Sequence, residues 1–280
     1  MNSEKNNKRQ VRRIIKVTAL AVVAAIVLVH VIHAMTLDRI VVYNEISFVS
    51  SVFPPEMDGY RIAFVTDVHA LDRFDGRLKA IVDELNKRQV DMLILGGDIA
   101  HGGADLASAM RLISQIVTTD GIYGVEGNHD QYEELFAAMR AFNMVALSNS
   151  GVCVRAGFYL AGVEDMWNRN PNISESIMGA GADSFVLLVS HNPDVTMMQD
   201  TMQIDLILSG HTHGGQLNFF GRWSIGLDSR VISHYGTRFR SGWSESRDGT
   251  PAYVSRGVGE YYPRVFARPE VTLITLRFYK

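Results

Sequence analysis

Cysteine is almost missing from this sequence of 280 residues. Cys153 is the single one, so the chain can form neither an internal disulfide nor a cysteine-based zinc site. We expect Cys153 to be a small buried apolar side chain. A surplus of basic charge is missing as well, because 27 Lys and Arg face 30 Asp and Glu, for a net charge of −3. That balance argues against binding nucleic acid along a basic face.

Formal charge is absent from residues 17–35, and this run has the length of a helix that crosses a bilayer. Residues 1–16 carry six Lys or Arg and a single acid, Glu4. We therefore expect a basic cytoplasmic tail over 1–16, an uncleaved transmembrane anchor over 17–35, and the remaining chain on the extracytoplasmic side. A buried core helix is the competing interpretation. His30 and His33 lie in the second half of this run and receive no predicted function.

Short apolar runs alternate with helical patterns after residue 37, which favours an α/β domain over residues 37–280. We expect a strand over 40–49, buried strands over 61–66, 92–95, 121–125, 185–189 and 206–208, and closing strands over 252–255 and 271–278. A helix is expected with Leu106, Met110, Ile113 and Val117 on one face, between others near 78–85 and 132–142. Residues 152–155 and 158–161 predict a hairpin, and 217–250 show no periodicity, which favours a long surface excursion.

Polar residues follow the end of each of five buried strands. Ligand sites of open α/β sheets gather outside the carboxyl ends of the strands, so these residues are expected to converge. Those able to bind a metal ion are Asp67, His69, Asp98, Asn128, His191, His211 and His213. Any one of them alone is more typical of a turn or a helix cap. Seven mixed oxygen and imidazole donors exceed the demand of one tetrahedral ion and predict two divalent cations, Mn, Fe or Zn.

The motifs D-x-H, GGD, GNHD, SH and GHTHGGQ, in this order, resemble the calcineurin-like metallophosphoesterase superfamily. The GHTHGGQ form, Val254-Ser-Arg-Gly257, Arg268-Pro-Glu-Val271 and the basic anchor are similar to its bacterial membrane-anchored branch. The resemblance spans about residues 37–280. It implies a metallophosphoesterase-type β-sandwich of mixed sheets flanked by helices, in four layers α/β/β/α, preceded by one transmembrane helix. Among the possible metals, it favours manganese.

The resemblance also implies roles for single residues. It places Asp67, His69 and His213 on a first ion, places Asn128, His191 and His211 on a second, and makes Asp98 the bridge between them. His129 matches the family's catalytic histidine, which is not a metal ligand. Many relatives carry an acid where this chain has His101, so the orientation of His129 is expected to come from Asp130 or a main-chain carbonyl.

The implied activity is hydrolysis of a phosphoester, a phosphodiester in the first place, by attack of a metal-bridging hydroxide. An alternative is a pyrophosphohydrolase acting on a nucleotide-linked lipid such as a UDP-diacylglucosamine, although a cytoplasmic substrate would conflict with the expected topology. A third hypothesis is a non-catalytic phosphate-binding module. It is disfavoured because all seven candidate ligands and His129 are present. Expected partners are the phosphoester substrate, a lipid or cell-envelope component among the candidates, and the membrane, but no nucleic acid.

Five further residues, two arginines and three tryptophans, have either a functional or a structural role. Arg256 and Arg264 are candidates for gripping a substrate phosphate, with a solvated or structural arginine at least as plausible. Trp167, Trp223 and Trp243 could line an aromatic or lipid-facing rim, although packing is the more usual role of tryptophan.

Overall fold

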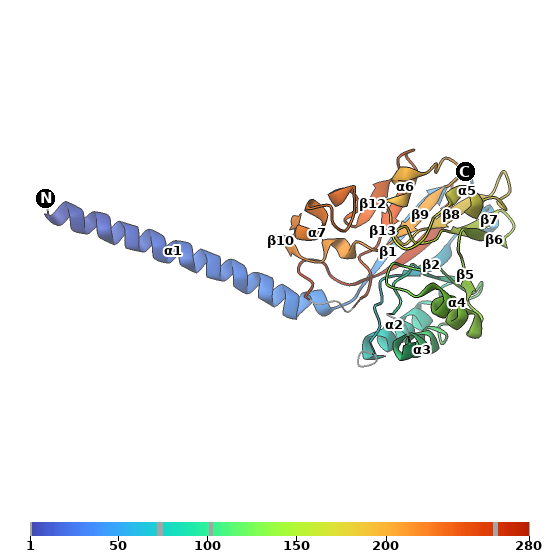
Figure 1. Cartoon of the computed structure of the whole chain (residues 1–280), viewed down its shortest axis with the longest axis horizontal. Helices are drawn as coiled ribbons and strands as arrows, with labels where there is room; N and C mark the ends of the chain where they lie inside the picture. The colour runs from blue at the N-terminus through green and yellow to red at the C-terminus, as the bar shows by residue number, and fades with distance from the viewer. Residues whose placement is uncertain (1, 72–74, 101–102, 260–262, 280) are drawn as a thin grey trace.

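The computed structural model describes residues 2–71, 75–100, 103–259 and 263–279. Its body is built around two six-stranded sheets, and the long N-terminal helix extends away from it (Figure 1). The first sheet has the strand order β1-β14-β2-β3-β4-β5. Its strands are β1 (Val42–Ser50), β14 (Glu270–Phe278), β2 (Tyr60–Val65), β3 (Met92–Leu95), β4 (Ile122–Gly124) and β5 (Val145–Ala146). All neighbours pair in parallel except β14 and β2, which are antiparallel.

The second sheet has the order β12-β13-β9-β8-β7-β6. Its strands are β12 (Gly242–Glu245), β13 (Pro251–Val254), β9 (Leu206–Ser209), β8 (Phe185–Val189), β7 (Phe158–Gly162) and β6 (Ser150–Arg155). The two outer pairs are antiparallel, and the three inner pairs are parallel. A separate two-stranded hairpin joins β10 (Asn218–Phe219) to β11 (Trp223–Ser224).

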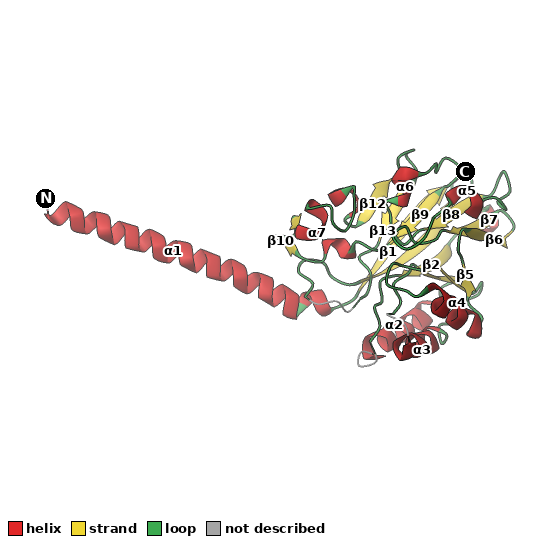
Figure 2. Cartoon of the chain, viewed as in Figure 1, coloured by secondary structure: helices red, strands yellow, loops and turns green. Residues whose placement is uncertain are grey.

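The helices fall into three groups (Figure 2). One long helix, α1 (Asn2–Met35), extends away from the body. Three helices follow the first strands, namely α2 (Asp75–Arg88), α3 (Gly103–Ile113) and α4 (Tyr132–Ala141). Short helices lie later in the chain, namely α5 (Ile173–Ser176), α6 (Val195–Met198) and α7 (Ile225–Asp228), with 3-10 turns at Leu37–Arg39, Pro55–Met57, His213–Gly215 and Gly236–Phe239.

The side chains of β2 show how the layers pack, because alternate residues of a strand point to opposite faces. Ala63 and Val65 belong to the apolar cluster that contains the inner faces of α2, α3 and α4. Ile62 and Phe64 belong to the cluster between the two sheets, which also contains Leu187 of β8. Both faces of the first sheet are therefore buried.

The outer face of the second sheet is also covered. Val186 and Leu188 of β8 share a third apolar cluster with Ile173 of α5 and Val195 of α6. The order of layers is thus helix, sheet, sheet, helix, which confirms the four-layer α/β/β/α expectation with mixed sheets.

The end of α1 is attached to the body by polar and aromatic contacts. The 18-residue window that could cross a membrane lies within residues 6–39, and none of it is buried in the chain. Asp38, just after the helix, accepts hydrogen bonds from the backbone amides of Phe266 and Ala267 at 2.9 and 3.2 Å. The competing interpretation of this segment as a buried core helix is therefore wrong.

Two expectations about single side chains are wrong. Val117 is 73% exposed because α3 ends at Ile113, and its amide donates to Asn86 in a turn instead of continuing the helix. Cys153 is exposed because β6 is the edge strand of its sheet and carries a bulge between Cys153 and Arg155.

The expectation of an irregular excursion over 217–250 holds only in part. The segment contains the β10–β11 hairpin, α7 and β12, and β12 extends the second sheet by pairing with β13. Leu227 and Phe239 are fully buried within it. These elements are only two to four residues long, which is too short for a helical or strand periodicity of apolar residues to be recognised in the sequence.

Candidate metal centre

Strands from both sheets end at the same place and bring the candidate ligands together. Backbone hydrogen bonds join the loops that follow β2 and β3, from the Asp67 amide to Gly97 and from the His69 amide to Asp98, both at 2.9 Å. In the second sheet the Gly210 amide donates to His191 at 3.0 Å. The predicted convergence at the strand ends is therefore present in the structure.

Three of the predicted ligands form a first group. The Nε2 atoms of His69 and His213 lie 3.2 Å apart, and His213 Nε2 lies 3.5 Å from Asp67 Oδ1. Their ligand atoms all fall within 4.8 Å of one another, which is the reach of a single ion. This group matches the set that the family resemblance assigns to one cation.

Asp98 lies between this group and a second one. Its Oδ2 is 3.5 Å from His69 Nε2 and 3.4 Å from His191 Nε2. Asn128 Oδ1 is 3.2 Å from His191 Nε2. Asp98 therefore lies near a histidine of each group, and Asp67 is a member of both candidate ligand groups.

His211 lies beside members of both groups. Its ring centroid is 5.1 Å from that of His191, and its backbone amide donates to both carboxylate oxygens of Asp67, at 3.1 and 3.0 Å. Its Nε2 lies 3.0 Å from the carbonyl oxygen of Ile232. When Nε2 donates there, Nδ1 carries the free lone pair and is the nitrogen able to bind a cation.

Burial makes the donor set costly without a cation. The side chains of Asp67, His69, Asp98, His191, His211 and His213 are each exposed by 9% or less. Burial raises the pKa of Asp67 to about 6, whereas the nearby His191 and His69 overcome the burial of Asp98 and hold its pKa well below the usual range. Clustered carboxylates and imidazoles at this depth fit divalent cations, which supply the charge that solvent cannot.

Two of the imidazoles are held in the neutral form. Burial, together with the neighbouring His191, lowers the pKa of His211 to about 3. Burial and the guanidinium of Arg264 likewise lower the pKa of His213 well below its ordinary value. Neutral imidazole is the form that ligates a metal, so the environment of His211 favours binding. At His213, Arg264 donates to Nδ1, so the neutral ring carries its proton on Nε2, the nitrogen that faces His69 and Asp67.

Several of the same residues have a strained backbone. Asp67, His69, Asp98, His211 and His213 all have positive φ angles, between 45° and 71°. This conformation costs a non-glycine residue on the order of 1–3 kcal/mol and persists where the surrounding structure enforces it, commonly at functional sites. Five of the seven predicted ligands are thus among the twelve described non-glycine residues with a positive φ.

Glycines allow the loops to approach this closely. A Cβ atom on Gly127 would lie 2.2 Å from Asp98 Oδ1, and one on Gly210 would lie 2.3 Å from Asp67 Oδ2. Gly257 has a φ of 66°, and a Cβ there would lie 2.5 Å from Asp67 Cβ. The approach of Gly257 to Asp67 explains why the motif around residue 254 belongs to the site, a role that was not predicted from the sequence.

We expect Gly257→Ala to weaken metal binding by displacing Asp67. The matched control is Gly249→Ala, because Gly249 has a φ of 84° but nothing within 4 Å of the added methyl group. Both variants should lose about 1–2 kcal/mol of unfolding free energy from the left-handed backbone. Only Gly257→Ala should also lose affinity for Mn²⁺, measured by isothermal titration calorimetry. Equal Mn²⁺ affinities in the two variants would contradict this role.

His129 lies at the edge of the centre and is exposed. Its ring is 5.3 Å from that of His69, and its backbone amide donates to Asp98 Oδ1 at 2.8 Å. The side chain of Asp130 instead accepts from the backbone amides of Gly127, Asp98 and Ile99, at 2.7 to 2.9 Å. Asp130 therefore joins the loops after β3 and β4. His101, which stands where many relatives carry an acid, lies outside the described residues.

The two candidate phosphate-gripping arginines have structural partners. Arg264 is fully buried and donates to Nδ1 of His213 at 3.0 Å and to the carbonyl oxygens of Arg256 and Ala267. Arg256 is ion-paired with Glu270 at 2.7 Å. Both arginines thus bind groups of the protein itself, Arg264 next to the metal centre and Arg256 at Glu270. The contact of Arg264 with His213 was not predicted from the sequence.

The three tryptophans have different surroundings. Trp167 contacts His211 edge to face, with centroids 4.7 Å apart, and so borders the metal centre. Trp243 packs on Phe48 and Tyr253. Trp223 is 59% exposed on the β10–β11 hairpin. The rim interpretation therefore suits Trp167, and the packing interpretation suits Trp243.

Known proteins resemble the chain in sequence over most of its length. The model of the family "Calcineurin-like phosphoesterase" matches residues 60–215. An uncharacterized metallophosphoesterase of Helicobacter pylori strain J99 is 28% identical over 71% of this chain and 54% of its own length. Bacillus subtilis YkuE, also an uncharacterized metallophosphoesterase, is 26% identical over 81% of this chain and 82% of its own. The chain thus spans about half the length of the Helicobacter relative.

Two further similarities concern a membrane protein and a solved structure. A transmembrane protein with metallophosphoesterase domain from Danio rerio is 26% identical over 93% of this chain and 62% of its own length. The crystal structure of a dimetal phosphatase from Danio rerio aligns with a TM-score of 0.46 and 11% identity, over 74% of this chain and 90% of that one.

Proposed function

This chain belongs to the calcineurin-like phosphoesterase family, and from that membership we propose that it is a dinuclear-metal hydrolase that cleaves phosphoester bonds, phosphodiesters in the first place. The observation that carries the proposal is the place of Asp98. Its Oδ2 lies 3.5 Å from His69 and 3.4 Å from His191, at the junction of the two donor groups.

The proposed ligand sets follow the two groups. Asp67, His69 and His213 would hold one cation, with Asp98 shared between both. Asn128, His191 and His211 would hold the other. When bound, such a pair of cations would neutralise charge on the phosphoryl oxygens and lower the pKa of water, so that hydroxide is available as the nucleophile at neutral pH. Mixed carboxylate, amide and imidazole donors suit Mn, Fe or Zn, and we favour Mn.

His129 is the proposed catalytic residue. Its exposed ring borders the centre next to His69, so it can reach a substrate without serving as a ligand. In hydrolysis a bond forms between the oxygen of water and phosphorus, and the bond from phosphorus to the ester oxygen breaks. His129 would donate a proton to that departing oxygen, which leaves as an alcohol.

The proposed organisation places a basic cytoplasmic tail at 1–16, a transmembrane anchor at 17–35 and the catalytic domain at 37–280 outside the cytoplasm. Support comes from α1, whose apolar window is wholly unburied, and from the basic residues that precede it. The similarity to transmembrane relatives is consistent with a single-pass membrane protein.

A pyrophosphohydrolase of a nucleotide-linked lipid is the second candidate. The observation that favours a lipid is the cluster of exposed apolar residues on the β10–β11 hairpin and α7, namely Phe219, Phe220, Trp223 and Ile225. A cytoplasmic nucleotide-lipid would, however, require the opposite topology. A non-catalytic phosphate-binding module is disfavoured because the complete donor set and His129 lie together.

The direct test uses the full chain in detergent, stripped of metal and titrated with Mn²⁺, Zn²⁺ or Fe²⁺. We expect no hydrolysis before metal is added. Turnover should then rise with added metal, and bis-p-nitrophenyl phosphate should be hydrolysed faster than p-nitrophenyl phosphate. Hydrolysis that survives thorough chelation would exclude the dinuclear mechanism, and preference for the monoester would exclude a phosphodiesterase.

A further inference from the structure

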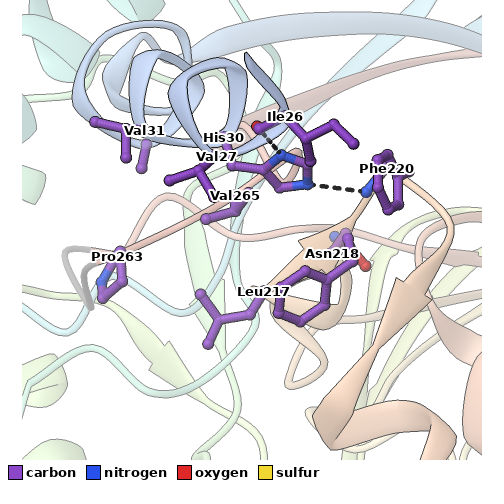
Figure 3. Close-up of a pocket in the computed structure, with 11 residues that line it drawn as sticks. Ile26, Val27, His30, Val31, Leu217, Asn218, Phe220, Pro263 and Val265 are labelled. Carbon is purple, nitrogen blue, oxygen red and sulfur yellow. Dashed lines mark hydrogen bonds between the residues drawn. The ribbon is translucent and has the colours of Figure 1, made fainter. Parts of the chain in front are cut away.

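An apolar pocket of about 490 Å³ lies between α1 and the body (Figure 3). Its α1 wall consists of Ile26, Val27, His30, Val31 and Ala34, whose spacing places them on one helix face. The opposite wall consists of Leu217, Asn218, Phe219, Phe220, Pro263 and Val265. The volume lies within the range of ordinary ligand sites.

His30 closes one side of the pocket without leaving a free polar atom. Its Nδ1 lies 2.8 Å from the carbonyl oxygen of Ile26, and its Nε2 accepts from the Phe220 amide at 3.1 Å (Figure 3). Its ring also contacts Phe219, Phe220 and Phe266, with centroids 5.1 to 6.0 Å apart. The pocket therefore has defined walls and an apolar interior.

The wall opposite α1 and the metal centre are built from the same two backbone segments. The segment that carries His213 runs on into Leu217 and Asn218, and the Asn218 amide group donates to Gly214 at 2.9 Å. The second segment carries Arg264, which donates to His213, immediately before Val265. The two segments are joined by backbone hydrogen bonds from Val265 to Gln216 and from Asn218 to Val265, at 2.8 and 2.9 Å.

The surroundings of the pocket are those of a surface that touches lipid. The hairpin and α7 lie on the side of the body from which α1 leaves (Figure 1). On them Phe219, Phe220, Trp223 and Ile225 are 45% to 63% exposed. Exposed aromatic and aliphatic side chains beside a membrane-length helix are typical of the membrane interface.

We propose that this pocket binds the hydrocarbon chain of an amphiphilic phosphoester taken from the lipid layer around α1, while the phosphoester group of the same molecule lies at the metal centre. The inference rests on the proposed function and assigns its substrate class. One wall belongs to the helix that we propose crosses the membrane, and the other continues along two backbone segments to His213 and its partner Arg264. A single molecule with an apolar tail and a phosphate head is the ligand that we assign to both.

A photoreactive probe tests the tail site without relying on catalysis. The full chain in nanodiscs is irradiated with a phosphatidylglycerol that carries a diazirine in its acyl chain, and the crosslinked peptides are identified by mass spectrometry. We expect crosslinks in residues 217–220 and 263–265 as well as in α1, and their loss on adding unlabelled phosphatidylglycerol. Crosslinks confined to α1 would show ordinary surrounding lipid and overturn the proposal.

Val31→Trp should fill the pocket, and Val29→Trp is the matched control. The two valines are 50% and 48% exposed, but only Val31 lines the pocket. Val31→Trp should lose the crosslinks at 217–220, and Val29→Trp should keep them. Val27→Trp, from the same wall, gives a second filling variant should Val31→Trp disturb the attachment of α1.

The same variants distinguish a loss of binding at the tail site from a loss of hydrolysis at the metal centre, when activity is compared on a lipid substrate and on a substrate without a tail. Each buried methylene group favours binding about fourfold. Val31→Trp should therefore lower kcat/KM for a long-chain phosphodiester lipid by about tenfold or more. It should leave bis-p-nitrophenyl phosphate unaffected. An equal loss for both substrates, or none, would contradict the tail site, whereas a wild-type chain inactive on every phosphoester would refute the proposed function alone.

Discussion

Asp98→Ala is expected to lose bound metal and hydrolytic activity together. The Asp98 carboxylate is the group that lies within 3.5 Å of the imidazoles of both His69 and His191. Without it, the two cations would lose their shared ligand and the negative charge that balances them. Since metal ions contribute several kcal/mol of transition-state stabilisation, turnover should fall by roughly 10³-fold or more.

Metal content per chain, measured by inductively coupled plasma mass spectrometry, and turnover of bis-p-nitrophenyl phosphate are the two readouts. Asp205→Ala is the matched control, because Asp205 is also a carboxylate that accepts a backbone amide, from Val186 at 2.8 Å. It lies at the opposite end of β8 and β9, so its loss should affect stability without removing metal. An Asp98→Ala chain that still holds two ions would disprove the bridging role.

His129→Ala is expected to reduce turnover by roughly 10²–10⁴-fold and to leave the metal content intact. The expected loss is catalytic because the His129 ring is exposed beside the centre, outside both ligand groups. A general acid matters most when the departing alcohol is a poor leaving group. The variant should therefore lose far more activity on an alkyl phosphodiester than on the nitrophenyl ester.

The loss of metal in His129→Ala would reclassify the residue as part of the metal centre. An equal loss of rate on alkyl and nitrophenyl esters would indicate charge stabilisation without proton transfer. His234→Ala serves as a control, because His234 is another exposed histidine, and it should behave as the wild type. Full activity of His129→Ala would remove this residue from the mechanism.

The ligand positions could be predicted from sequence because two local signals coincide at each of them. A buried strand is short and apolar, and the residues that follow it are polar, so Asp67, Asp98 and His191 could be placed at strand ends without knowledge of the fold. Their convergence then followed from the general behaviour of strand ends in α/β sheets. In the structure the ligand atoms of Asp67, Asp98 and His191 lie within 4.8 Å of one another.

Features that depend on contacts distant in sequence could not be predicted. Arg264 is buried and donates a hydrogen bond to His213, a residue 51 positions away in the sequence. The close approach of Gly257 to Asp67 is equally non-local. Cys153 is exposed because β6 is an edge strand of its sheet. The order of strands in a sheet cannot be read from the composition of a single strand. Val117 continued a helical spacing that the turn after Ile113 interrupts.

The pocket beside α1 illustrates the same limit. His30 and His33 had no predicted role in a membrane-length helix, yet each contacts the aromatic ring of Phe266. A pattern that identifies an apolar helix gives its length but not the surface that it packs against. That surface is assembled from β10 with its flanking residues, 217–220, and from residues 263–266, which are far from α1 in sequence.

Anomalous diffraction from crystals of the full chain grown with Mn²⁺ is the most direct test of the central claim. The account predicts two anomalous peaks on either side of the Asp98 carboxylate, one next to His69 and His213 and the other next to His191 and Asn128. A single peak, or peaks that do not touch Asp98, would contradict it.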